Sequence, residues 1–269
     1  MQVYRGMDIG TAKPTAGERA AVPHHMIDLV DPSERFSVGR FQREGTAVLE
    51  ALADAPVLIV GGSGLHFRSL VDPLEFPPSD RTVKADVEAL EREDAVAALL
   101  AVDPSAPDHV DMANPRRVAR ALEVHRITGL TPSHRAGTPE AQAVRDYRPA
   151  VPFVAVGVDP GDRLAGRVEQ RLDAMLDAGL LDEVASLEGR MGRTASSAVG
   201  YRQLLPVVRS DRTLQEGRSH TLSATTGLAR RQRTYFRRDP RIRWAEWEDD
   251  AGRRTDAVMA ALEEAGWTS

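Results

Sequence analysis

The chain has 269 residues, of which 42% are hydrophobic and 28% charged, and its formal net charge at pH 7 is −5. A chain of this length forms one large domain, or a core domain with a smaller inserted one. Because the sequence contains no cysteine, disulfides, thiolate metal sites and a cysteine nucleophile are excluded. No apolar run approaches the roughly 18 residues that cross a bilayer and no secretory signal is present, so we expect a cytoplasmic protein.

Short apolar runs predict the strands of a parallel α/β sheet. The most specific run is residues 57–60 (VLIV), which the glycine turn 61–64 (GGSG) and the start of a helix follow, as in a βα unit. Further strands are predicted at 25–30, 153–158 and 242–244. The fold class is therefore α/β.

Apolar residues at helical spacing predict the helices between these strands. In the α/β portions they cover residues 36–53, 163–187, 214–238 and 256–264. From about residue 77 the strands give way to helical patterns at 83–93, 95–102 and 114–128. The predicted organisation is an α/β core in residues 1–76, a helical insertion in 77–135, and the rest of the core with C-terminal helices in 136–269.

Two glycine-containing segments are candidates for ligand binding. The turn 61–64 lies at the carboxyl end of a predicted strand, where open α/β sheets bind ligands. Its backbone amides and the Ser63 hydroxyl suit a phosphate or sugar oxygen, but a structural turn with Ser63 as N-cap explains it equally well. The loop 6–14 (GMDIGTAKP) carries Thr11 and Lys13, which suit an anionic ligand. Taken by itself, a solvated surface turn is the simpler interpretation of that loop.

No direct protein ligand for a metal and no triphosphate cradle is predicted. His24 and His25 have no further ligand at metal-binding spacing. The pattern G-x-x-x-x-G-K-[ST] does not occur in the chain.

Arginines gather on three predicted helices although the total charge is negative. Asn114 and Pro115 begin one helix as N-cap and first-turn residue, and the arginines that follow oppose the helix dipole unless an anion binds there. These arginines are Arg116, Arg117 and Arg120. Arg167 and Arg171 lie one turn apart on a second helix. On the third, aromatic residues alternate with Arg230, Arg231, Arg233, Arg237 and Arg238, a pattern that favours polyphosphate or RNA contact.

In chain order these motifs resemble the tRNA dimethylallyltransferase (tRNA isopentenyltransferase) family. The first motif, residues 2–14 (QVYRGMDIGTAKP), is long and highly specific. The others are residues 24–28 (HHMID), 36–41, 60–65 (VGGSGL), 115–117, 120–124, 128–129, 179–184 (GLLDEV), 199–201 (VGY), 230–233 and 235–237. The resemblance covers essentially the whole chain.

The resemblance implies a fold and an activity. The fold is a P-loop-kinase-like core of the nucleotide-binding, ATP-binding kind, a parallel sheet flanked by helices, with a helical tRNA-binding insertion. The activity is transfer of a dimethylallyl group from dimethylallyl diphosphate to N6 of the adenosine adjacent to the tRNA anticodon, with Mg²⁺ required. Such a reaction needs a base for the amine, a diphosphate clamp and extrusion of the target base. The expected partner is the tRNA anticodon stem-loop, and the protein is expected to be a monomer without membrane contact.

By the same resemblance, individual residues take roles. Gln2 reads the edge of the target adenine, Ser63 and Lys84 contact tRNA near that base, Thr11 and Lys13 line the channel, Arg167 and Arg171 face the diphosphate, and Arg116, Arg117 and Arg120 hold the anticodon stem. Ser63, Arg167 and Arg171 are the catalytic candidates. Arg230 and Arg233 are additional candidates for substrate binding.

The sequence departs from the family pattern at its start and at three single positions. The family's N-terminal strand and Gly-rich Lys-Ser/Thr loop are not found, and its Asp-Ser-x-Gln motif survives only as Met1-Gln2. The aspartate that serves as general base is thus not found either. Ser63 stands for the usual Thr, His66 for Tyr and Asn114 for Asp.

These departures leave two hypotheses open. The chain is a prenyltransferase whose recorded N-terminus is incomplete, as a start assigned at an internal methionine would produce, or it is a catalytically inactive tRNA-binding remnant. Under both, we expect the 269 residues alone to be poorly soluble and to transfer prenyl groups slowly. The genomic sequence upstream of Met1 distinguishes the two.

Overall fold

The computed structural model describes residues 1–52 and 55–267, which fall into two compact units. Unit 1 comprises Met1–Leu70 and Phe153–Ser269, and unit 2 comprises Val71–Pro152. Unit 2 is wider than the helical insertion 77–135 predicted from the sequence. The segments on either side belong to it, and Ala150 N–H donates to the Val71 carbonyl at 2.7 Å.

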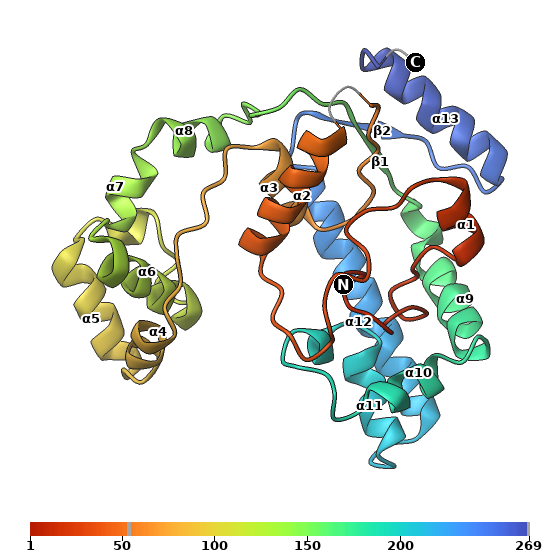
Figure 1. Ribbon diagram of the computed structural model, residues 1–269, viewed down its shortest axis with the longest axis horizontal. Helices are drawn as coiled ribbons and strands as arrows, with labels where there is room; N and C mark the ends of the chain where they lie inside the picture. Colours follow the sequence, from red (N-terminus) through yellow and green to blue (C-terminus); the bar gives the residue numbers. More distant parts are fainter. Residues whose placement is uncertain (53–54, 268–269) are drawn as a thin grey trace. The chain divides into compact units, whose positions relative to one another are not determined.

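Unit 1 contains a small parallel sheet. Strand β1 (Ala155–Val158) pairs with β2 (Ile242–Ala245), with Ala155 opposite Ile242. Helix α13 (Ala251–Glu264) packs against both strands (Figure 1). The strands predicted at 153–158 and 242–244 are confirmed, and so is the α/β class.

The other helices of unit 1 are α1 (Ala16–Ala21), α2 (Val38–Leu52), α3 (Gly64–Val71), α9 (Leu164–Asp177), α10 (Leu180–Leu187), α11 (Tyr201–Val208) and α12 (Leu214–Phe236). Short 3₁₀ turns lie at Gly161–Arg163 and Ala195–Ser197. Helix α12 begins where Thr213 and Glu216 form a capping box. It packs against α9 and α11 (Figure 1).

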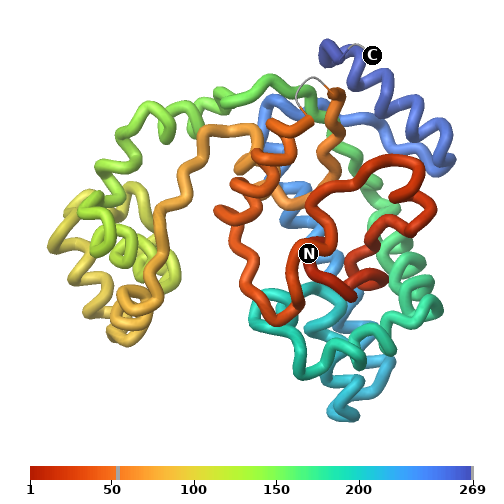
Figure 2. Tube along the Cα trace, in the orientation of Figure 1, coloured from red at the N-terminus to blue at the C-terminus, as the bar shows by residue number. Residues whose placement is uncertain are grey.

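The N-terminal segment supplies much of the core of unit 1. Tyr4 and Met7 are fully buried, together with Val184 of α10 and Tyr201 of α11. Tyr4 forms a single parallel bridge with Val30. Figure 2 shows this segment in red near the green-to-blue trace of α9 to α11, whose residues share the same core. The residues that read as a surface turn are therefore anchored in the core.

Unit 2 is helical. Its elements are α4 (Arg81–Glu88), α5 (Arg92–Val102), a 3₁₀ turn at Ala106–Asp108, α6 (Pro115–Thr128), α7 (Pro132–Ala136) and α8 (Pro139–Arg145). Asn114 caps α6 as predicted, and Gly129 ends it in the left-handed region at φ 73°. The core between α4, α5 and α6 contains Val87, Leu99 and Leu122.

Two predicted strands are wrong. Residues 57–60 belong to no ladder in the described residues, and Leu58 and Val60 are 78% and 84% exposed. An apolar run forms a strand only where a neighbour pairs with it, and none does here. In 25–30 only Val30 forms a bridge, because Met26 and Asp28 have φ values of 62° and 55°, which break the extended conformation.

The helix boundaries differ most from the prediction in three places. The single helix predicted over 163–187 is two, α9 and α10, because Gly179 has φ 96° between them. Helix α4 ends before the predicted residue 93, and α13 begins before the predicted residue 256, at the N-cap Asp250. The end of the helix predicted over 36–53, at Ala53, lies outside the described residues. Among the helices of 1–52 and 55–267, none combines the length and apolar character that a membrane span needs.

Candidate functional site

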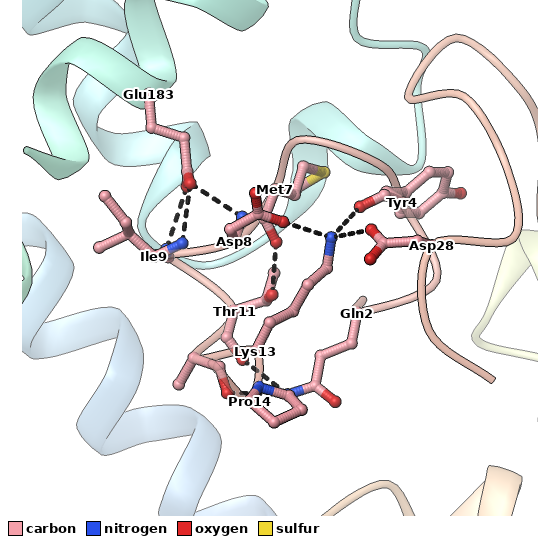
Figure 3. Close-up of polar contacts among 12 residues, drawn as sticks. Gln2, Tyr4, Met7, Asp8, Ile9, Thr11, Lys13, Pro14, Asp28 and Glu183 are labelled. Carbon is pink, nitrogen blue, oxygen red and sulfur yellow. Dashed lines mark hydrogen bonds and ion pairs between the residues drawn. The ribbon is translucent and has the colours of Figure 1, made fainter. Parts of the chain in front are cut away.

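The loop 7–13 of unit 1 is a closed turn. Its backbone is tied by Lys13 N–H to the Asp8 carbonyl and by Ala12 N–H to the Ile9 carbonyl, both at 3.0 Å. The Thr11 hydroxyl donates to the Met7 carbonyl at 2.5 Å, as drawn in Figure 3. Thr11, which was predicted to line the channel, thus stabilises its own loop.

Lys13 forms the polar centre of the loop (Figure 3). Its side chain is only 2% exposed, and the ammonium donates to the Tyr4 carbonyl (2.6 Å), Asp8 (2.6 Å) and Asp28 (2.5 Å). An ammonium has three N–H donors, so all of them are used. Burial opposes ionisation of Asp28, but hydrogen bonds from Lys13 and Arg19 hold the pKa of that carboxyl below its usual value. Lys13 therefore connects the loop to Tyr4 and Asp28 within the protein. Its predicted contact with a substrate stays a prediction.

The amide of Gln2 is fixed by the same loop. Its Nε2 donates to the carbonyls of Thr11 (3.1 Å) and Ala12 (2.9 Å) (Figure 3). Because both N–H groups are used, the side chain presents its remaining oxygen as an acceptor. This geometry suits a ligand with an N–H donor.

Glu183 of α10 holds the loop from the other side. Its carboxylate accepts the backbone N–H groups of Asp8 (2.8 Å), Ile9 (2.7 Å) and Gly10 (3.1 Å) (Figure 3). It also accepts the Tyr201 hydroxyl at 2.5 Å. Burial and the neighbouring Glu183 raise the pKa of Tyr201, so the phenol stays a donor.

The predicted turn at Ser63 precedes α3. The Ser63 hydroxyl lies 2.7 Å from His66 Nδ1, and the His66 ring packs edge-on against Phe41. Burial lowers the pKa of His66, so its ring is neutral at pH 7. A side chain at Gly62 would lie 2.5 Å from the Gln232 amide nitrogen of α12, so this glycine permits the close approach of α12.

Arg163, the N-cap residue of α9, and Arg167 within α9 contact the segment that follows β2. The Arg167 guanidinium stacks on Trp247 at 4.4 Å, and Arg163 pairs with Asp249 at 3.0 Å. A shallow hollow of about 890 Å³ lies beside them, lined by Asp162, Arg163, Gly166, Arg167, Glu169, Gln170, Asp173 and Asp249. Arg171 is exposed. Contact of Arg167 and Arg171 with a diphosphate stays a prediction.

The arginines near the end of α12 divide into two kinds. Arg233 donates to Asp159 at 2.7 Å, and Arg237 pairs with the same carboxylate at 3.1 Å. Burial opposes ionisation of Asp159, but the Gly161 amide and both arginines keep its pKa below the usual value. Arg233 therefore anchors α12 to the end of β1. Arg230 is exposed and forms no side-chain bond within the described residues.

In unit 2 the three predicted arginines of α6 also differ. Arg120 donates to the carbonyls of Pro77 (2.6 Å) and Pro78 (3.0 Å) and pairs with Glu123 at 2.8 Å. Arg117 is exposed and pairs with Asp111 at 3.6 Å, whereas Arg116 is exposed without such a partner in the described part of the chain. Lys84 of α4 lies 3.7 Å from Glu88.

Sequence reasoning assigned no role to Glu183, Tyr201 or Asp28, although each lies in a segment that carries the family resemblance. Their partners lie in other segments of the chain: Asp28 bonds to Lys13 and Arg19, Tyr201 bonds to Glu183, and Glu183 bonds to Ile9, 174 residues away. Only the fold brings them together, so no local pattern identifies them. Across 1–52 and 55–267, no three histidine or carboxylate side chains are grouped as a metal site.

The fold and these side chains define a mainly helical α/β protein with an N-terminal loop closed by internal hydrogen bonds, helices that carry arginines, and a second, helical unit. Residues 2–239 match the model of the IPP transferase family, and the chain belongs to that family. It is 41% identical over 98% of its length to a tRNA dimethylallyltransferase of Bifidobacterium animalis subsp. lactis, of which it covers 76%. It is 45% identical over 91% of its length to one from Streptomyces avermitilis, of which it covers 79%.

A solved structure supports the same relationship. The tRNA isopentenylpyrophosphate transferase of Staphylococcus epidermidis is 27% identical and aligns with a TM-score of 0.66, covering 98% of this chain and 88% of its own. The family resemblance predicted from the sequence is thereby confirmed.

Proposed function

We propose that this protein transfers a dimethylallyl group from dimethylallyl diphosphate to N6 of the adenosine adjacent to the anticodon of tRNA. The observation that carries the proposal is the family match over residues 2–239, which contain both the loop 7–13 and the Ser63 turn. Relatives at 41% and 45% identity bear the name tRNA dimethylallyltransferase. Nothing in these comparisons favours the inactive alternative.

The reaction forms a bond from the adenine amine nitrogen to the allylic carbon, while the bond from that carbon to the diphosphate oxygen breaks. The diphosphate leaves with the electron pair, and the amine releases one proton to a base. In this scheme Gln2 accepts a hydrogen bond from the amine, and the Ser63 hydroxyl contacts the nucleoside. Arg167 and Arg171 stabilise the negative charge that develops on the diphosphate.

Mg²⁺ belongs to the proposal as an ion carried by the diphosphate. Mg²⁺ binds substrate phosphates and water with only one or two protein carboxylates, so a diphosphate can carry it into a site without a dedicated protein cage.

The tRNA is proposed to bind through exposed arginines. Arg116 and Arg117 of unit 2 and Arg230 of α12 have guanidinium groups at the surface, and phosphate contacts of this kind supply most of the affinity for nucleic acid. We place the enzyme in the cytoplasm as a monomer.

The test is transfer of labelled dimethylallyl groups to an anticodon stem-loop, with the product of the complete reading frame that encodes these residues. We expect label on a stem-loop with adenosine at the target position and none when guanosine replaces it. Binding of the stem-loop without any transfer would support the inactive tRNA-binding alternative. Absence of both binding and transfer would contradict the proposal as a whole.

A further inference from the structure

Glu183 joins three segments that are far apart in the sequence. Its carboxylate accepts the N–H groups of three consecutive residues, Asp8, Ile9 and Gly10, at 2.7–3.1 Å. The fully buried Tyr201 donates its hydroxyl to the same carboxylate at 2.5 Å. Figure 3 shows the Glu183 side chain reaching the loop from α10.

The four groups hydrogen-bonded to this carboxylate are all donors. Successive backbone N–H groups that converge in this way form an anion-binding concavity, and here a side chain of the protein fills it. A carboxylate accepts only, so it satisfies every donor. An amide in its place would direct an N–H group toward them.

A chain of hydrogen bonds through the loop connects Glu183 to Gln2. Asp8 and Ile9, whose N–H groups Glu183 holds, also accept the bonds from Lys13 and Ala12 that close the turn. The Thr11 and Ala12 carbonyls at its far side then hold Gln2 Nε2 at 3.1 and 2.9 Å. The orientation of the Gln2 amide thus depends on a turn that Glu183 fixes.

We infer that Glu183 is a positioning residue that, through the loop 8–12, holds Gln2 with its oxygen free to accept a hydrogen bond from the exocyclic amine of the target base. The inference rests on the proposed function, because it requires that Gln2 meets that base. A 6-keto purine presents an acceptor to an acceptor and is disfavoured. Glu183 therefore contributes to adenine selectivity without contacting the nucleotide.

The experiment measures affinity for two anticodon stem-loops, one with adenosine and one with inosine at the target position. The variants are Glu183→Gln and, as a matched control, Glu188→Gln, which removes an exposed pair with Arg209 near the end of α10. We expect the unchanged protein and the control to prefer adenosine about tenfold. Glu183→Gln is expected to reduce that preference to about one.

A second measurement is independent of RNA. Hydrogen exchange at the amides of Asp8, Ile9 and Gly10 is expected to accelerate in Glu183→Gln and not in the control. If Glu183→Gln does not fold, Tyr201→Phe replaces it in the affinity measurement. This variant keeps the three amide bonds to Glu183 and is expected to lose part of the preference for adenosine. Unchanged exchange or an unchanged preference in the folded variants overturns the inference. If the unchanged protein does not distinguish the two stem-loops, the assigned role of Gln2 in the proposed function fails instead.

Discussion

Among single residues, burial decides which cationic side chains remain for a ligand. Lys13 and Arg120 were both predicted to bind substrate, yet the first donates to three internal acceptors and the second to two carbonyls and a carboxylate. Arg116 and Arg171 are exposed. The residue types could be read from the sequence, but not that Lys13 also donates to Asp28 and Arg120 to the Pro77 and Pro78 carbonyls, because these acceptors lie in other segments.

Glu123 gives a residue-scale prediction about pH. It is 3% exposed, accepts the Ser79 hydroxyl at 2.5 Å and pairs with Arg120 at 2.8 Å. Although burial opposes ionisation, these bonds hold its pKa below the usual 4.5. Its stabilising contribution is therefore complete above that pH and is lost as the pH falls through the folded-state pKa.

We expect Glu123→Gln to lower stability by about 2 kcal/mol at pH 7. The difference should shrink steadily as the pH is lowered below 4.5. Thermal melting of both proteins between pH 7 and pH 3 measures it, with Glu88→Gln, which removes an exposed carboxylate, as control. A difference that does not depend on pH would contradict this account of Glu123.

Gly10 gives a second prediction at this scale. A Cβ there would lie 2.6 Å from the ring of Tyr201, which is fully buried. We expect Gly10→Ala to destabilise the protein by about 1–3 kcal/mol, because an overpacked core must shift. The control is Gly17→Ala in α1, where the added methyl meets nothing within 4 Å and helix propensity favours Ala. Equal melting temperatures for the two variants would show that the loop is not packed as described.

Among the elements, those determined by local signals could be predicted and those determined by distant partners could not. The helix predicted over 214–238 is found as α12, since a capping box begins it at Thr213. The break at Gly179 was missed because the apolar spacing continues across it. The run 57–60 has strand composition, but a ladder also requires a neighbour, which no local pattern supplies.

Helix α6 carries the prediction about tRNA. We expect Arg116→Glu together with Arg117→Glu to weaken binding of an anticodon stem-loop and to flatten the dependence of affinity on salt by about one unit for each phosphate that the protein no longer neutralises. Arg120 is left unchanged because it holds Pro77, Pro78 and Glu123. Arg126→Glu, an exposed position at the other end of α6, is the control. Unchanged affinity and slope in the double variant would exclude this end of α6 from the RNA interface.

The exposed segment 57–60 carries a prediction about solubility. Short apolar β-prone runs at the surface promote aggregation, and Leu58 and Val60 are largely exposed. We expect Leu58→Lys together with Val60→Lys to reduce light scattering of concentrated protein, with little change in melting temperature. Val22→Lys, at an isolated exposed position, should have no such effect. Equal scattering by both variants would show that the run does not drive self-association.

For the whole molecule, the residues proposed to bind the substrates are distributed over both compact units. Unit 1 contains the loop 7–13, the Ser63 turn and the arginines of α9 and α12, and unit 2 contains Lys84 and the arginines of α6. The fold class and the family were correctly predicted from the sequence, because the motif order spans the chain and is specific. The internal bonding of the loop required the structure.

The most direct test of the central claim is nucleoside analysis of tRNA by mass spectrometry after deletion of the gene that encodes this chain. The account predicts that dimethylallyl-modified adenosine disappears from tRNA and returns when the intact gene is restored. A copy with Gln2 and Ser63 both changed to Ala should restore little of it. Undiminished modification in the deletion strain would contradict the assignment of this protein as the tRNA dimethylallyltransferase of its cell.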